Sequence, residues 1–345
     1  MAFPVEYVTE EDTISDAATK IQTSASLRTS TAILLTLLLI ATYLLNLILF
    51  VTILFDKKLR SRILYVFFCH LAALNFVTST FTVLFSLIFV ANGEWTMGMG
   101  ACRLSAMMQQ FCSLYTLFSL LIMAVERVAV LGETTKRPLF TGQRSFLFHA
   151  AVAGIGLAVT VPLLTNAIPV KQFGYRYLCS IGSGAPIVWT GSSILLFFGC
   201  MFVFLFCAGA ILGKKTNKRN LPVNAEHNTA FISMTRTLHE DISLGKLVLV
   251  LLCLFVLMSG PYSFLCYYYQ IRNSNEVLAG GPVEEMNNDV DTLITWLSFL
   301  FPLFAPILIF SWSPDIWPSV KALFCCRSTE PPYLGATLFY PPNGE

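Results

Sequence analysis

The sequence predicts an all-α protein whose seven helices cross a membrane as one bundle. Hydrophobic residues make up 55% of the chain and charged residues only 12%, whereas a typical soluble domain is about 25% charged. The apolar residues are concentrated in seven runs, each long enough to cross a hydrocarbon core of about 30 Å as a helix. The net charge of +2 gives no indication of nucleic-acid binding. The lipid bilayer is therefore the first partner that the sequence indicates.

The apolar runs divide the chain into three regions. Residues 1–30 are polar and acidic, and we expect them to form a disordered extracellular segment without a cleavable signal peptide. Residues 31–326 are expected to form the membrane domain, and residues 327–345 a short cytoplasmic tail. The expected spans, of which the third is the longest, lie near residues 31–54, 64–91, 102–131, 146–168, 186–212, 244–270 and 290–312.

Lysine and arginine indicate which side of the membrane is the inner one. The loop after the first span reads DKKLRSR, and the loop after the fifth contains KKTNKR. The N-terminal segment and the loop before the seventh span are acidic instead. Because cytoplasmic loops carry the excess of cations, we expect a multi-pass protein of the cell membrane with its N-terminus outside and its C-terminus inside.

The third run, from Cys102 to Arg127, is the helix around which we expect the others to pack. At about 1.5 Å per residue its length is roughly 37 Å, so its polar ends reach opposite interfaces. Unpaired amides in hydrocarbon cost several kcal/mol, so Gln109 and Gln110 indicate that this helix is inside the bundle. One face carries residues in steps of three or four: Gln109, Ser113, Thr116, Leu120, Met123 and Arg127.

The first two spans each carry an asparagine at mid-membrane depth. Asn46 and Asn75 are expected to form an interhelical amide contact, worth about 0.6–2 kcal/mol. His70 lies nearer the inner side, where a hydrogen bond to a neighbouring helix is a commoner role than a pH switch.

The last two spans are interrupted by proline. Gly260 and Pro261 predict a kink in the sixth span, which the segment RTLHED at 236–241 could extend inward. After the seventh span, DIWPSVKALFCC is typical of an amphipathic helix on the inner membrane surface. Pro318 fits there only in the first turn of that helix.

Four of the ten cysteines stand out from those in apolar runs. Cys102 and Cys179 lie on the outer, oxidising side, where a disulfide between them is chemically permitted. Cys179 belongs to an outer loop, VKQFGYRYLCS, that mixes aromatic residues with two cations. Cys325 and Cys326 follow the seventh span on the inner side and indicate palmitoylation, with unmodified thiols as the alternative.

These features together resemble the rhodopsin-like (class A) G-protein-coupled receptors over roughly residues 30–326, with an orphan-type receptor and no narrower subfamily indicated. The seven spans, the outside N-terminus and the 25-residue separation of Cys102 from Arg127 carry the resemblance. The other family positions appear in order: Asn46, Asn75 in HLAALN, Trp95, Glu126-Arg127-Val128, Phe255, Pro261 and Ala305-Pro306. The resemblance implies the Cys102–Cys179 disulfide.

The chain also departs from the family pattern at several positions. Asn75 replaces the carboxylate that binds sodium in most relatives, and Ser259 stands where a toggle tryptophan is usual. Ala305 and Ile309 replace the Asn and Tyr of the NPxxY motif, and the fourth span lacks its usual tryptophan. The fold assignment is unaffected, but the usual activation relay is in doubt.

For the inner side, the resemblance implies that Arg127 is the residue that meets a heterotrimeric G protein. It is expected to be held by its neighbour Glu126 and by Asp241, which lies 20 residues before the kink proline Pro261. The alternative for Asp241 is a solvated acid in a loop.

For the outer side, the resemblance implies a pocket for an extracellular ligand. Gln109 stands where amine receptors carry an aspartate, and Phe299 where opsins carry the retinal lysine, so a cationic amine and retinal are both excluded. The expected pocket is neutral, amidic and aromatic, although the same residues could serve interhelical packing instead. Its expected residues are Gln109, Gln110, Ser113, Tyr262, Ser263, Cys266, Tyr269, Asp291 and Thr295.

The leading hypothesis is a receptor that transmits an extracellular signal to G proteins, without a cofactor or metal. Three alternatives remain: a chemosensory receptor, an uncoupled receptor-like partner or decoy, and a membrane transporter. A transporter would normally show ionisable residues in its spans or an internal repeat. An enzyme is not expected, because no HExxH, GxSxG or metal-binding cluster lies at a membrane face.

Overall fold

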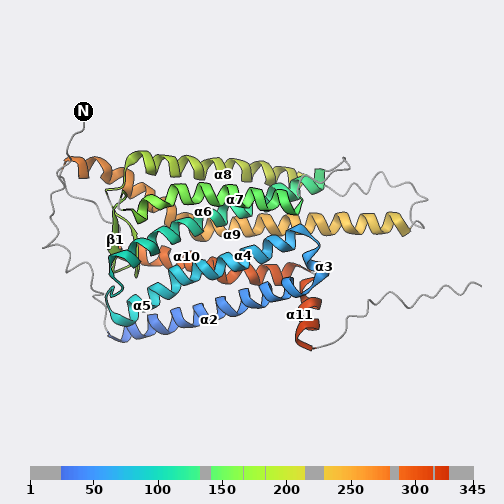
Figure 1. Ribbon diagram of the computed structural model, residues 1–345, viewed down its shortest axis with the longest axis horizontal. Coiled ribbons are helices and arrows are strands. Elements are labelled where there is room, and N and C mark those ends of the chain that lie inside the picture. The colour runs from blue at the N-terminus through green and yellow to red at the C-terminus, as the bar shows by residue number, and fades with distance from the viewer. Residues whose placement is uncertain are drawn as a thin grey trace, which may run out of the picture.

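The computed structural model describes residues 25–132, 141–165, 167–182, 184–213, 229–279, 287–313 and 315–325. Seven of its helices are long and apolar enough to cross a membrane. They run side by side along one axis of the molecule (Figure 1). The prediction of an all-α bundle of seven transmembrane helices is confirmed.

The spans are built from the following elements. The first is α2 (Ala25–Phe55), and after the short α3 (Lys57–Arg60) the second combines α4 (Ile63–Ser79), the π-helix η1 (Thr80–Leu84) and α5 (Phe85–Asn92). The third to seventh are α6 (Gly98–Gly132), α7 (Gly142–Leu164), α8 (Ile187–Gly213), α9 (Thr229–Ala279) and α10 (Asn288–Trp312). A hairpin of β1 (Val170–Phe173) and β2 (Leu178–Ile181) lies between α7 and α8, and α11 (Ile316–Cys325) follows α10.

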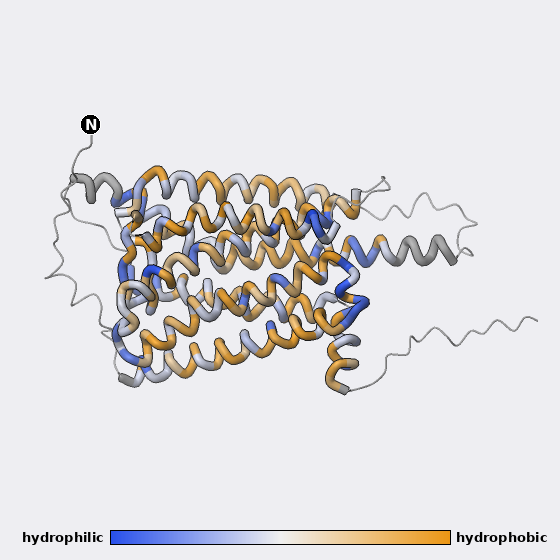
Figure 2. The backbone as a smooth tube through the Cα atoms, in the orientation of Figure 1, coloured by the Kyte–Doolittle hydropathy of each residue, from blue (hydrophilic) through white to orange (hydrophobic). Residues whose placement is uncertain are grey.

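The two ends of the bundle differ in structure and polarity. The β1–β2 hairpin lies at one end, called the hairpin end below, and α11 lies across the other, the α11 end (Figure 1). Figure 2 shows a long apolar middle along the helices and hydrophilic residues gathered near both ends. This is the distribution that a bilayer requires of a bundle that spans it.

Helix α6 is the centre of the bundle. It packs against α4, α7, α8, α9 and β2, and Leu120 and Met123 on it are fully buried. The largest core cluster surrounds the C-terminal half of α6 and includes Phe68 of α4, Leu251 of α9 and Ala305 of α10. The expectation that the third span lies inside the bundle is therefore confirmed.

Three features differ from the sequence-based expectations. The longest helix is α9, with 51 residues, and not the third span; its inward extension includes the RTLHED segment. The fourth span, expected near residues 146–168, is α7 and lies at Gly142–Leu164, four residues earlier at both ends. The second span contains η1, where the hydroxyls of Thr80 and Thr82 donate to carbonyls four residues back. No hydrophobic period signals this change of helix type.

Candidate functional site

The polar face of α6 opens onto a small cavity in the half of the bundle nearer the hairpin end. The cavity has a volume of about 50 Å³, enough for a few water molecules but well below the roughly 300–1,000 Å³ of ligand pockets. Next to it, the Gln110 amide donates to the hydroxyl of Tyr267 on α9, at 2.9 Å. The α6 glutamines therefore face α9 and the cavity, away from lipid.

The residues expected to bind a ligand fall into three groups. Five of them line the cavity together: Gln109, Gln110, Ser113, Tyr262 and Ser263. Cys266 and Asp291 lie around the side chain of Arg176 instead. Tyr269 packs edge-on against Tyr268, and buried Thr295 donates to the Asp291 carbonyl, so these two lie outside the cavity lining.

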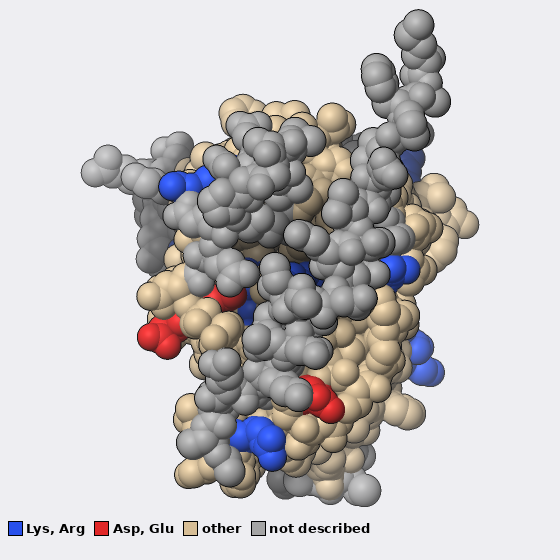
Figure 3. Space-filling view, turned by 90° about the vertical axis from the view of Figure 1, so that its left-hand side faces the viewer, with Lys and Arg blue, Asp and Glu red and all other residues tan. Residues whose placement is uncertain are grey.

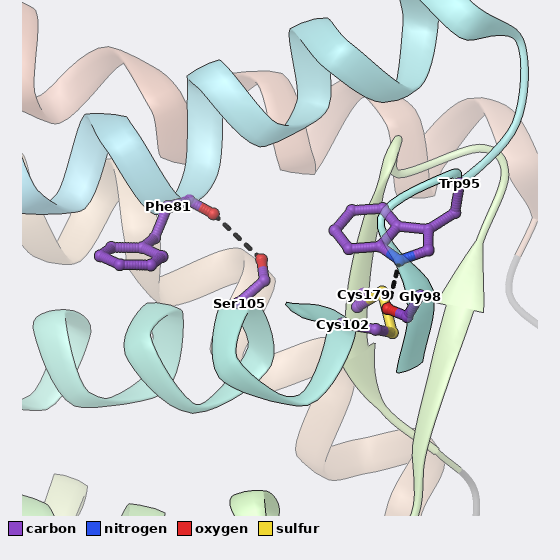
Figure 4. The surroundings of a disulfide bond; sticks show 6 residues. All are labelled: Phe81, Trp95, Gly98, Cys102, Ser105 and Cys179. Atoms are coloured by element: carbon purple, nitrogen blue, oxygen red, sulfur yellow. Dashed lines mark hydrogen bonds between the residues drawn. A yellow bond between two sulfur atoms is a disulfide. The ribbon is translucent and has the colours of Figure 1, made fainter. Parts of the chain in front are cut away.

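The hairpin is held against the bundle by a disulfide. Cys102, at the start of α6, is bonded to Cys179 of β2 (Figure 4), so this prediction is confirmed. In β2, Cys179 pairs with Gln172 of the antiparallel β1. The indole of Trp95 lies beside the disulfide and donates to the Gly98 carbonyl at 2.9 Å (Figure 4). The hairpin was not expected from the sequence, because its strands are only four residues long.

The hairpin turn places Arg176 inside the bundle. The Arg176 amide closes the turn on the Phe173 carbonyl, and the next residue, Tyr177, has a left-handed φ of 56°, which is uncommon for a non-glycine residue. Arg176 Nε lies 2.6 and 2.7 Å from the two carboxylate oxygens of Asp291 on α10. Both residues are 6% exposed, so the pair is a buried salt bridge.

The surroundings keep Arg176 charged. Burial by itself lowers the pKa of the guanidinium, but the neighbouring acidic groups, Asp291 among them, outweigh burial and raise it above its ordinary value. One sequence feature pointed to this contact: a cation in an aromatic segment beside Cys179. The partner was not predictable, because Asp291 is 115 residues away.

The hairpin also contacts α9 and α10, two of the helices that line the cavity. The hydroxyls of Ser180 on β2 and Tyr262 on α9 share a hydrogen bond of 2.9 Å. Thr292 on α10 donates to the Tyr175 carbonyl in the turn at 3.0 Å. Together with the disulfide to α6, these contacts connect the hairpin to three different spans.

At the α11 end, Arg127 is held between two carboxylates. Its guanidinium donates to both Glu126 oxygens, and its Nη1 lies 3.2 Å from Asp241 Oδ1 on α9. The side chains of Arg127 and Glu126 are 7% and 3% exposed, whereas that of Asp241 is 34% exposed. The three line a cavity of about 330 Å³ that opens between α4, α6 and α9.

A second group of charges at this end was not expected from the sequence. Asp315, between α10 and α11, lies 3.2 Å from Lys58 of α3 and 3.2 Å from Arg62. Arg62 also lies 3.9 Å from Glu240 of α9. Lys58 and Arg62, two of the cations used above to predict the membrane orientation, therefore also connect the loop between the first two spans to Asp315, just before α11, and to α9.

Deeper in the bundle, the expected asparagine contact is present. The Asn75 amide donates to Asn46 Oδ1 at 3.0 Å, and the Asn46 amide donates to the Pro302 carbonyl on α10 at 2.9 Å. His70 packs edge-on against Tyr115 and His149. The two asparagines thus connect three spans. The Pro302 carbonyl needs this donor, because Pro306, one turn later, has no backbone N–H to give it.

The residues expected to carry lipid lie at the limit of the described chain. Cys325 is the last residue of α11, and its side chain and Cys326 lie outside the described residues. Pro318 falls in the first turn of α11, as required. The expected N-terminal segment at residues 1–30 and the tail at 327–345 also lie outside the described residues. The exception is residues 25–30, which form the start of α2.

Comparison with known proteins decides the family. The family model described as 7 transmembrane receptor (rhodopsin family) matches residues 45–308, most of the chain. The chain belongs to this family. It is similar to squid rhodopsin in fold, with a TM-score of 0.74, 17% identity and 90% of each chain covered. Among curated proteins it is 24% identical over 298 residues to G-protein coupled receptor 161 of Xenopus tropicalis, covering 79% of this chain and 55% of that receptor.

Membership in the rhodopsin family makes this a multi-pass membrane receptor. The chain spans only about half the length of the curated relative it matches. At 17% identity, the similarity to squid rhodopsin shows the fold alone. Phe299, which stands where opsins carry the retinal lysine, is buried in the hydrophobic cluster that contains Cys102 and Cys179.

Proposed function

We propose that this rhodopsin-family protein is a cell-surface receptor that transmits an extracellular signal to a heterotrimeric G protein. The observation that carries the proposal is Arg127, a buried cation in a cavity of about 330 Å³ at the α11 end. The hairpin end and the N-terminus then face outward, and the cation-rich loop at α3 faces the cytoplasm. Cys325 and Cys326 would be palmitoylated beside the inner membrane surface.

Arg127 supplies the coupling contact when α9 moves away from α6. Glu126 lies on the same helix as Arg127 and moves with it, whereas Asp241 lies on α9. Separating the helices therefore breaks the Arg127–Asp241 pair, at 3.2 Å, and leaves a guanidinium with free donors at the cavity mouth. A partner that binds only this open state would shift the population toward it.

The ligand pocket in this proposal lies at the hairpin end, between α6, α9 and α10. The residues proposed to contact the ligand are those expected from the sequence: Gln109, Gln110, Ser113, Tyr262, Ser263, Cys266, Tyr269, Asp291 and Thr295. Only the first five of them line the cavity of about 50 Å³, so a ligand that touches all nine requires the pocket to widen. Amides, hydroxyls and aromatic rings dominate this set, and its one carboxylate is already paired with Arg176. A ligand without a cationic amine fits that chemistry.

The first prediction concerns basal signalling. Asp241→Ala is expected to raise G-protein activation without ligand, because a partly exposed ion pair contributes about 1 kcal/mol, or roughly a fivefold shift in population. Arg127→Ala is expected to abolish signalling. The measurement is G-protein activation in cells, normalised to surface receptor, with Asp289→Ala at the hairpin end as the matched control.

An uncoupled partner or decoy is the second candidate, favoured by Ser259, Ala305 and Ile309 at positions of the usual relay. In a coupled receptor, a free-energy difference of about 1.4 kcal/mol between the inactive and active states would leave roughly a tenth of the molecules active without ligand. Surface-expressed wild type without basal activity, unchanged by Asp241→Ala, would favour the decoy. Antibody access to an N-terminal tag in intact cells tests the orientation separately.

A further inference from the structure

The Arg176 side chain occupies the interior of the bundle at the hairpin end. Its guanidinium lies between the Asp291 carboxylate on α10 and the Cys266 sulfur on α9, 3.5 Å from Nη1. The ring of Phe173 lies on one side, with its centroid 4.2 Å from Cζ, and the ring of Tyr262 lies 5.6 Å away. Ion pairing, ring stacking and burial are the contacts by which proteins hold a bound guanidinium ligand.

Tyr262 connects this side chain with the small cavity described above. Its ring lines the cavity from α9 and also faces Arg176. Arg176 itself is not one of the residues that line the cavity. Figure 3 views the hairpin end and shows charged side chains of both signs scattered over a surface that is mostly uncharged where it is described.

We propose that Arg176 is a ligand supplied by the chain itself: its guanidinium fills the cation site at Asp291 and shields Cys266 from the extracellular side. The site at Asp291 therefore binds a guanidinium group, and the β1–β2 hairpin of the same chain supplies it. An external ligand that leaves the pair in place needs no positive charge of its own.

Two physical features make the occupancy stable. The disulfide at Cys179 and the hydrogen bond of Ser180 to Tyr262 fix the hairpin only a few residues from Arg176. Withdrawing the guanidinium would leave Asp291 as a buried and uncompensated charge, the costly outcome when one partner of a buried pair is removed. Cys266 is partly buried while the pair is in place, and states in which the pair opens and exposes it further are therefore rare.

Reaction of Cys266 with a thiol reagent measures this shielding. The full-length receptor in intact cells is treated from outside with a membrane-impermeant, sulfonate-bearing methanethiosulfonate, whose negative charge gains nothing from an unpaired Asp291. We expect slow labelling of the wild type and labelling faster by about tenfold or more in Arg176→Ala, because access requires local opening that the pair suppresses. Cys266→Ser identifies the labelled thiol.

The controls separate the pair from a general loss of charge. Lys171→Ala removes an exposed cation from the same hairpin and is expected to label at the wild-type rate. Guanidinium chloride is expected to slow labelling of Arg176→Gly, whereas sodium chloride at equal ionic strength is not. No protection by guanidinium would count against the assigned chemistry of the site.

Rapid labelling of Cys266 in the wild type overturns the proposal whatever the variants do. If Arg176→Ala does not reach the cell surface, the exchanged pair Arg176→Asp with Asp291→Arg decides: slow labelling supports the proposal and rapid labelling overturns it. The inference rests on the proposed outward orientation, which staining of an N-terminal tag in the same cells checks. It does not require coupling, so a failed signalling assay leaves the labelling result interpretable.

Discussion

At the residue scale, three polar contacts inside the bundle connect elements that are far apart in the sequence. Asn75 reaches Asn46, Gln110 reaches Tyr267, and Arg176 reaches Asp291. Each pair satisfies groups that would cost several kcal/mol if left alone in hydrocarbon. Such pairs fix which faces of neighbouring helices meet.

The pairing at Asn75 leads to the second prediction, that sodium is not an allosteric ligand. Asn75 is neutral and already donates to Asn46, and Ala305 is buried without a side-chain oxygen, so the oxygen shell that a hard cation prefers is incomplete. We expect the same melting temperature in sodium chloride and choline chloride at equal ionic strength. A sodium-specific stabilisation would contradict this, and Asn75→Asp tests whether a carboxylate is what the site lacks.

At the scale of the element, α9 is the helix that both ends of the receptor act on. Its outer part contacts the hairpin through Tyr262, and its inner part contacts α6 through Asp241. Between them Pro261 interrupts the helical hydrogen bonds of the span. A single element thus connects the contacts at the two ends.

Gly245 on α9 provides the third prediction, because the helices approach closely there. A Cβ added at Gly245 would lie 3.2 Å from Ile211 Cγ2 on α8 and 3.8 Å from Arg127 Cβ on α6. The Cβ is crowded only against α8, but the two further methyl groups of valine also need room between α8 and α6. Gly245→Val is therefore expected to push α9 away from both helices, weaken the Arg127–Asp241 pair and raise basal signalling several-fold at equal surface expression.

The matched control for Gly245→Val is Gly199→Val on α8, where an added Cβ meets nothing within 4 Å. It should leave basal signalling unchanged. Equal signalling from wild type and Gly245→Val would show that the close approach of α9 does not restrain the receptor.

At the scale of the whole molecule, stability depends on packing around α6 more than on the hydrophobic effect. Lipid replaces water around the bundle, so burying an apolar side chain between helices gains little transfer free energy. What remains is close packing, which is lost when a cavity forms. The outer faces of α7 and α8, by contrast, remain largely exposed to the bilayer.

The fourth prediction compares one leucine in each environment. Leu120 on α6 is fully buried, whereas Leu195 on α8 is 75% exposed. Leu120→Ala is expected to destabilise the bundle by about 2 kcal/mol, the low end for buried leucines, because mainly the cavity term applies. Leu195→Ala should change stability little. Thermal unfolding of both variants in the same detergent measures the difference, and equal losses would refute the central role of α6.

The sequence by itself determined the fold class, the seven spans and the central third helix, because each follows from local composition and period. It also indicated the Asn46–Asn75 contact, because amides are costly to leave unpaired in a membrane. The pairing of Cys102 with Cys179 followed from the resemblance to the receptor family. Five of the nine expected pocket residues lie on one cavity, since they share helix faces.

The tertiary structure alone decided which polar groups meet. Arg176 and Asp291 are 115 residues apart, and Lys58 and Asp315 are 257 apart, so no local pattern links them. The hairpin and η1 were missed for a related reason: short strands and a widened helical turn are set by contacts with the surrounding spans. Charges and loops become a site only when the packed helices bring them within a few ångströms of each other.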